Sequence, residues 1–254
     1  LPAAPDRERP AGDPDKLEEA AKLLGNAEKP MIYSGGGVLN SEAWDELFTL
    51  AEMIQAPVVM SPNGRGAVSD RHYLGQNSLA GRELIQDADV VFCVGTRMIE
   101  PATYPWGLQP SRTVIQMDID PEEVGRNYDL TVGIVADAKT GLAALAERVA
   151  AHNRKRNSGE DELMGVKQRS RDALDAINPQ AAYAWAIRNE LPDDGIFIGE
   201  MTQIAYWANL GFPTYAPRTW ITPTGYLTLG FALPAALGAK IAKPETPVVA
   251  MVGD

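Results

Sequence analysis

Two features near the end of the sequence could together hold a diphosphate and a metal ion. A glycine-rich turn around Gly225 leads into an alanine- and glycine-rich segment, for which we predict a helix from about Leu227 to Ala242. Helix N-termini present unpaired N–H groups and the positive end of the helix dipole, and both favour a phosphate. An apolar run then ends at Gly253 and Asp254, where a carboxylate at a strand end suits a small divalent cation. The same pattern also fits a plain turn and a helix packed closely on a sheet, so both interpretations remain open.

A second set of candidates lies in the first half of the chain. Gly35 and Gly36 follow an apolar run and precede a helical pattern, as in a dinucleotide-binding loop. The full G-x-G-x-x-G spacing is missing, however, and its absence favours a tight strand–helix turn. Arg97 and Asp118 each follow an apolar run. Ligands bind open α/β sheets at strand carboxyl ends, so these side chains could hold pyrophosphate and ribose. Alternatively, Asp120 caps a following helix and Arg97 pairs with a surface acid.

The elements that would position these residues alternate along the chain. Continuous apolar runs between amphipathic segments predict a parallel α/β sheet covered on both faces. We predict strands at 30–34, 57–60, 90–94, 113–117, 132–135, 195–198 and 248–252. We predict helices at 14–26, 41–55 with Ser41 as the cap, 83–88, 121–128, 138–151, 179–190, 203–210 and 227–242.

This pattern divides the chain into two α/β units. Residues 1–12 are expected to be a linker and 13–150 a Rossmann-like central domain. The polar stretch 151–178 is interpreted as an interdomain linker, exposed at least over its first half. Residues 179–254 then begin a second α/β domain, which is incomplete because its βα series stops before a sheet could close.

Composition excludes several classes of function. The 254 residues carry a net charge of −11, which argues against nucleic acid or an anionic membrane surface as a partner. No run approaches the roughly 18 apolar residues of a membrane span. Cys93 is the single cysteine and lies in an apolar run, so we expect a core residue, no disulfide within the chain and a cytoplasmic location. With only two histidines, the chain has few ligands for a catalytic zinc ion and few candidates for a His-based nucleophilic mechanism.

The segment from Thr222 to Ala239 resembles thiamine-diphosphate enzymes, in particular the acetolactate synthase-like family. In that family this segment precedes a Gly-Asp-Gly magnesium motif, and Gly253 with Asp254 stands where the motif begins. The resemblance implies Asp254 as a Mg²⁺ ligand and places Gly225 and Gly253 at the cofactor.

The same resemblance extends to the segment around Met201, Thr202 and Gln203, which looks like the loop that touches the cofactor diphosphate. Thr202 stands where many members have Gly, which weakens any inference about the substrate. The backbone at Leu227 and Leu229 would bond the aminopyrimidine, and the Leu229 side chain would prop the cofactor into its bent form or else be a core leucine. We assign Glu200 no acid–base role, because a strand-end carboxylate is usually solvated or caps a helix.

The segments at Arg97 and Asp118 resemble the family's central domain, which carries FAD in some members, ADP in others and no nucleotide in many; FAD is therefore a further candidate. The resemblance implies a thiamine-diphosphate- and Mg²⁺-dependent lyase or transferase that makes or breaks a C–C bond beside a carbonyl in a 2-oxo acid or related small molecule. It also implies a homodimer or homotetramer, because the cofactor lies between subunits.

Several points stay open at this level. No catalytic residue is identified, and we expect this 254-residue piece alone to be inactive, since the family's activating Glu belongs to another domain. A nucleotide-binding Rossmann-like module and a nicotinamide-dependent oxidoreductase remain alternatives.

Overall fold

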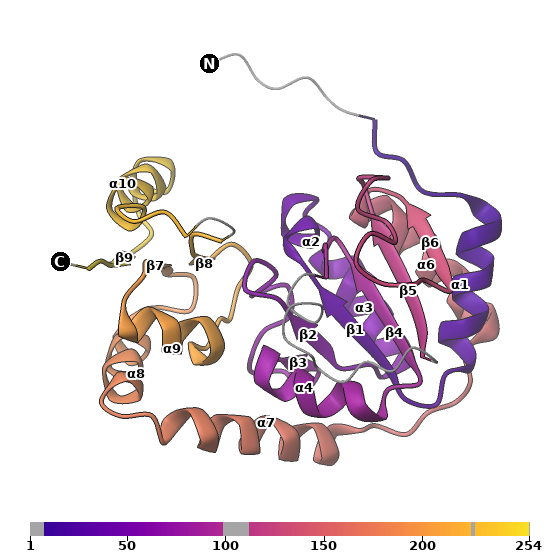
Figure 1. Ribbon diagram of the computed structural model, residues 1–254, viewed down its shortest axis with the longest axis horizontal. Helices are drawn as coiled ribbons and strands as arrows, with labels where there is room; N and C mark the ends of the chain where they lie inside the picture. The colour runs from indigo at the N-terminus through magenta and orange to yellow at the C-terminus, as the bar shows by residue number, and fades with distance from the viewer. Residues whose placement is uncertain (1–7, 99–111, 225–226, 254) are drawn as a thin grey trace.

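The structure is a computed structural model that describes residues 8–98, 112–224 and 227–253. Six parallel strands form one sheet in the order β3-β2-β1-β4-β5-β6 (Figure 1). The strands are β1 Pro30–Ser34, β2 Val58–Met60, β3 Gly75–Gln76, β4 Val90–Val94, β5 Thr113–Asp118 and β6 Val132–Val135. The predicted α/β class with a parallel Rossmann-like sheet is confirmed, and the chain order of the strands reverses direction between β1 and β4.

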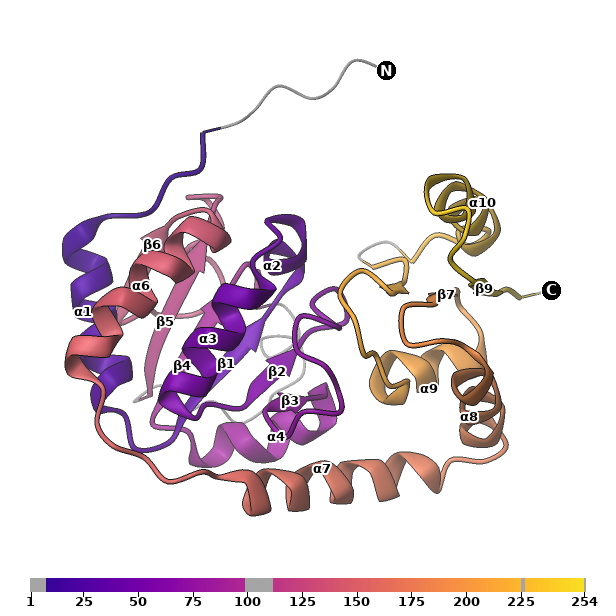
Figure 2. The same ribbon diagram turned by 180° about the vertical axis from the view of Figure 1, so that it is seen from behind.

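Both faces of this sheet are buried, because successive side chains of a strand point to opposite sides. In β1, Ile32 packs with Phe92 of β4 in one core, and Met31 packs with Val91 in the other. Helices cover both faces, and Figure 2 shows α3 and α6 in front of the sheet. Cys93 lies in the second core with no exposed surface, and burial raises the pKa of its thiol, as expected for an inert core cysteine.

Local sequence accounts for most helices of this unit. Asp13 begins the first helix by accepting hydrogen bonds from the N–H groups of Asp15 and Lys16, at 2.9 and 3.3 Å. Asp137 caps the last one in the same way. The helices are α1 Pro14–Asn26, α2 Gly36–Asn40, α3 Trp44–Ile54, α4 Ser78–Asp87 and α6 Ala138–His152.

Two local predictions in this unit are wrong. Ser41 is not the N-cap of α3: its hydroxyl donates to Asp137 Oδ2 at 2.9 Å, and α3 begins only at Trp44. Residues 121–128 form turns and bends instead of a helix. The buried amide of Gln116 holds this stretch, donating to the Glu123 carbonyl at 3.2 Å and accepting from Gly125 N–H at 2.9 Å. These bonds replace the helical ladder that Asp120 would otherwise begin.

The second unit has its own parallel sheet, in the order β8-β7-β9. Stacked Phe197 and Trp220 form a core with Trp207 on one face, and Ile196 and Ile198 form a core with α10 on the other. The elements are α8 Gln180–Glu190, β7 Ile196–Gly199, α9 Gln203–Gly211, β8 Trp220–Ile221, α10 Ala232–Ala242 and β9 Val248–Met251.

A long helix, α7 Glu160–Asp175, occupies most of the stretch interpreted as a linker. It runs from the six-stranded sheet to the second unit (Figure 1). Its buried side chains, at Leu163, Val166, Ser170 and Leu174, keep helical spacing among many exposed charged residues. No helix in the described ranges is long and apolar enough to cross a membrane.

Candidate cofactor site

Three segments meet at the carboxyl edge of the small sheet. The strands are parallel, so the residues that follow β7, β8 and β9 come together at one edge. These are Glu200 to Gln203 after β7, Thr222 after β8 and Gly253 after β9. A methyl group placed on Gly253 would lie 3.8 Å from Cγ2 of Thr202. The predicted loop at 201–203 and the predicted strand end at Gly253 are thus neighbours.

The 201–203 loop forms the start of α9. The Thr202 hydroxyl caps this helix by accepting from Ala205 N–H at 3.0 Å. The Gln203 side chain accepts from the Gln180 amide at 2.6 Å. Within the described ranges, the N–H groups of Gln203 and Ile204 have no acceptor. The first turn of α9 therefore keeps donors of the kind that bind a phosphate oxygen.

The N-terminus of α10 is different, and the start predicted for this helix is wrong. The helix begins at Ala232 instead of Leu227. Its end already carries a negative group, because the Glu200 carboxylate accepts from Gly230 N–H and, at 3.3 Å, from Ala232 N–H, which leaves Leu233 N–H without an acceptor in the described ranges. Glu200 is only 6% exposed, so of the two roles that the sequence left open, a solvated carboxylate or a helix cap, it has the second.

The residues before α10 are exposed and partly strained. Leu227 has φ of 52°, in the left-handed region that branched side chains rarely adopt. The Leu229 side chain is 76% exposed, so it is not a core leucine. Leu229 directly precedes Gly230, whose N–H donates to Glu200. Gly225 and Asp254, which complete the predicted site, lie outside the described residues.

The glycine loop after β1 packs against the main chain of Val94 and Gly95. Gly35 N–H donates to the Val94 carbonyl at 2.9 Å and Gly37 N–H donates to the Gly95 carbonyl at 3.0 Å. A Cβ on Gly35 would lie 2.2 Å from the Gly95 oxygen, whereas one on Gly36 would meet Asn63 Cβ at 3.1 Å. The glycines therefore serve close packing of two loops at the point where strand order reverses, which is the interpretation that the incomplete motif favoured.

Arg97 and Asp118 lie at the carboxyl ends of adjacent strands without pairing. Arg97 is exposed, and its carbonyl accepts from the Asn127 amide at 2.5 Å. Asp118 is partly buried, and its carboxylate accepts from Asp120 N–H at 3.1 Å. Burial raises the pKa of Asp118, and the nearby acids Asp120 and Glu123 add to this. Nothing in the geometry of these residues or of the glycine loop supports FAD.

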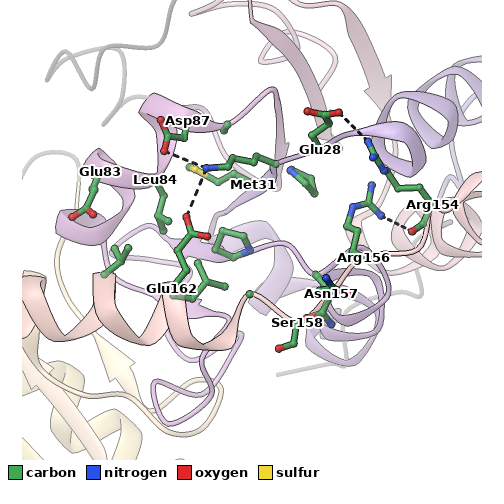
Figure 3. Close-up of a pocket in the computed structure, with 18 of the residues that line it drawn as sticks. Glu28, Met31, Glu83, Leu84, Asp87, Arg154, Arg156, Asn157, Ser158 and Glu162 are labelled. Atoms are coloured by element: carbon green, nitrogen blue, oxygen red, sulfur yellow. Dashed lines mark hydrogen bonds and ion pairs between the residues drawn. The ribbon is translucent and has the colours of Figure 1, made fainter.

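A cavity of about 460 Å³ lies at the amino-terminal edge of the large sheet (Figure 3). Several of its charged groups are paired with one another. Lys29 Nζ lies 3.4 Å from Asp87 Oδ2 and 3.7 Å from Glu162 Oε1, and Arg154 lies 3.4 Å from Glu28. None of the predicted site residues lines this cavity.

Two residues at the boundary of the units were not singled out from sequence. Asn63, after β2, donates its amide to the Thr224 hydroxyl at 2.7 Å and so holds the segment just before Gly225. Arg65 is buried and donates to the Ala208 carbonyl at 2.6 Å and to the Phe212 carbonyl, both at the end of α9. Their sequence, Asn-Gly-Arg-Gly, indicates only a loop.

Comparison with known proteins decides the family. A model of the thiamine pyrophosphate enzyme central domain matches residues 17–145, which is half of the chain. The chain belongs to the thiamine pyrophosphate enzymes. A second model, the C-terminal TPP binding domain of these enzymes, matches residues 200–254 and so begins at Glu200.

Several curated relatives match nearly the whole chain. A probable 2-ketoarginine decarboxylase from Pseudomonas aeruginosa is 34% identical over 247 residues, which are 94% of this chain and 44% of that protein. An acetolactate synthase from Mycobacterium leprae is 33% identical over 258 residues, 94% of this chain and 41% of that protein. A sulfoacetaldehyde acetyltransferase from Rhodobacter capsulatus is 34% identical over 289 aligned positions, 100% of this chain and 49% of that protein. The chain thus spans less than half the length of these relatives.

The described residues fit the diphosphate of such a cofactor. The first turn of α9 supplies N–H donors without acceptors, and the Thr222 hydroxyl, after β8, is buried without a partner in the described ranges. A metal ion needs oxygen ligands, and no group of three or more His, Cys, Asp or Glu in the described part of the chain could hold one. The predicted metal ligand, Asp254, is not among those residues.

Proposed function

We propose that this protein is a thiamine-diphosphate- and Mg²⁺-dependent lyase or transferase that forms or cleaves a C–C bond beside a carbonyl, with a 2-oxo acid or related small molecule as substrate. The observation that carries the proposal is the meeting of the 201–203 loop, Thr222 and Gly253 at one sheet edge. The relatives support it, because they are named as a decarboxylase, an acetolactate synthase and an acetyltransferase.

The chain's own residues would divide the work of holding the cofactor. The N–H groups of Gln203 and Ile204 would bind diphosphate oxygens, with Met201 and Thr202 fixing the entry to the helix. Asp254 would ligate Mg²⁺, and Gly225 and Gly253 would let the backbone approach closely. When bound, thiamine diphosphate supplies a carbon that stabilises the carbanion formed beside the carbonyl.

The apolar residues before α10 would face the organic part of the cofactor. Leu229 would support its bent form, and the backbone at Leu227 would bond the aminopyrimidine. Exclusion of water by such side chains strengthens the electrostatic interactions in the site. No observation in the described residues favours a nicotinamide-dependent or FAD-binding alternative.

We also propose a homodimer or homotetramer and a cytoplasmic location. The first is supported by an apolar stripe on α10, where Leu233 and Leu237 are each 59% exposed and Ile241 is 82% exposed. The second is supported by the single, buried cysteine. Light scattering of the purified protein tests the assembly.

The function is tested by cofactor titration and turnover in the protein at its full natural length. We expect thiamine diphosphate to bind in the presence of Mg²⁺ and to support consumption of pyruvate or another 2-oxo acid. Asp254→Ala should weaken binding roughly 10- to 100-fold. Asp118→Asn, on the other unit, is the control and should bind normally. Absence of cofactor binding to the wild type would refute the proposal.

A further inference from the structure

Glu200 is a buried carboxylate with an unusual set of partners. Its two oxygens accept hydrogen bonds from the main chain at Gly230 and Ala232, thirty and thirty-two residues further along. Only 6% of the residue is exposed, and no cation pairs with it in the described ranges. A buried carboxylate is costly unless hydrogen bonds satisfy it, and here backbone N–H groups do so.

The helix that Glu200 contacts has no cap of its own. The residue at the N-cap position of α10 is Phe231, which has helical backbone angles and makes no side-chain hydrogen bond to the first turn. Its predecessor, Gly230, has φ of 75°, which favours glycine. The end of α10 thus depends on a carboxylate from another segment.

The backbone of Glu200 is held at the same time. Its N–H donates to the Met251 carbonyl of β9 at 3.1 Å, and its carbonyl accepts from Thr202 N–H at 2.9 Å. One residue therefore joins three segments of this region: the 201–203 loop, the turn before α10 and the strand that leads to Gly253.

This arrangement distinguishes two helix N-termini at the same sheet edge. The start of α9 follows β7 and keeps the N–H groups of Gln203 and Ile204 without acceptors in the described ranges. The start of α10 follows β8 and already carries a negative group. A diphosphate is repelled by a carboxylate and attracted by free N–H donors, so the two ends are not equivalent for it.

We infer that Glu200 is a positioning residue for the cofactor: it occupies the N-terminus of α10, fixes the turn from Leu227 to Gly230, and leaves the N-terminus of α9 as the place for the diphosphate. The inference rests on the proposed function. It assigns Glu200 no proton transfer.

The test compares Glu200→Gln, Glu200→Asp and wild type at full natural length. Gln keeps the size but leaves one oxygen to accept and directs an NH₂ group at an N–H donor, so the turn before α10 loses a partner. We expect the dissociation constant of thiamine diphosphate to rise roughly 10- to 100-fold in Glu200→Gln. Turnover at saturating cofactor should stay within about threefold of wild type, and Glu200→Asp, which keeps the charge, should recover part of the affinity.

Asp137→Asn is the matched control, because Asp137 is also a buried carboxylate that caps a helix, α6, by accepting from Lys139 N–H and Thr140 N–H. It should lower stability without changing cofactor affinity. Hydrogen exchange of residues 229–233 should accelerate in Glu200→Gln and not in Asp137→Asn.

The possible results distinguish failure of this inference from failure of the proposed function. Wild-type cofactor affinity and slow exchange at 229–233 in Glu200→Gln would overturn the inference while leaving the proposed function intact. Equal loss of affinity in Glu200→Gln and Asp137→Asn would also overturn it, since general destabilisation would then explain both. A wild type that binds no thiamine diphosphate would refute the proposed function as well.

Discussion

The guanidinium carbon of Arg65 lies 4.5 Å from the ring centroid of Trp220, across the boundary between the two α/β units. The same guanidinium donates to carbonyls at the end of α9, whose other end carries the 201–203 loop. Burial lowers the pKa of Arg65 to about 10, which still leaves it charged at neutral pH. The large sheet thereby fixes the helix that bears the candidate diphosphate donors.

Arg65→Met should destabilise the protein by about 2–4 kcal/mol, because two buried carbonyls lose a charged donor and Asp70 loses a nearby cation. Urea unfolding followed by tryptophan fluorescence measures this. Arg82→Met, an exposed position on α4, is the control and should change stability by no more than about 0.5 kcal/mol. Equal effects at the two positions would show that the Arg65 contacts contribute nothing.

Gly35→Ala should cost about 2–3 kcal/mol or more, because the new methyl group would overlap the Gly95 carbonyl. Gly36→Ala should be close to neutral, since Asn63 needs to move only slightly and alanine favours the helix that begins there. Thermal unfolding of the two variants side by side gives the comparison. A tolerated Gly35→Ala would contradict the close packing of the two loops.

Asp118→Asn should stabilise the protein at pH 7 by on the order of 0.5 kcal/mol. The pKa of Asp118 is raised by burial, so folding favours its protonated form, and its contribution to stability is lost as the pH rises through the folded-state pKa. The advantage of Asn should therefore shrink below the ordinary Asp pKa of 3.8. Urea unfolding at pH 3.5 and pH 7 measures the difference in unfolding free energy between Asp118→Asn and wild type at each pH. A larger advantage of Asn at the acidic pH would contradict a raised pKa of Asp118.

The strands of the large sheet could be predicted because each carries its own signal. β4 is apolar at every position and β1 is apolar up to Ser34, which is typical of strands buried on both faces, and Asp13 marks the start of α1. The helical spacing from Leu163 to Leu174 would have revealed α7, although its charged residues indicated a linker.

Other features depend on distant partners and had no local signal. Ser41 looks like a helix cap, but its hydroxyl is taken by Asp137, 96 residues away. The turns at 121–128 depend on Gln116, and the start of α10 depends on Glu200. In the candidate site, the 201–203 loop could be identified by resemblance alone. The role of Glu200, which makes the N-termini of α9 and α10 different for a diphosphate, could be recognised only from the fold.

The most direct test of the candidate site is hydrogen–deuterium exchange of the full-length protein with and without thiamine diphosphate and Mg²⁺. The site described here predicts slower exchange at residues 201–205 and 227–230 when the cofactor is added, and unchanged exchange at 34–38. Protection of 34–38 without protection of 201–205 would contradict it.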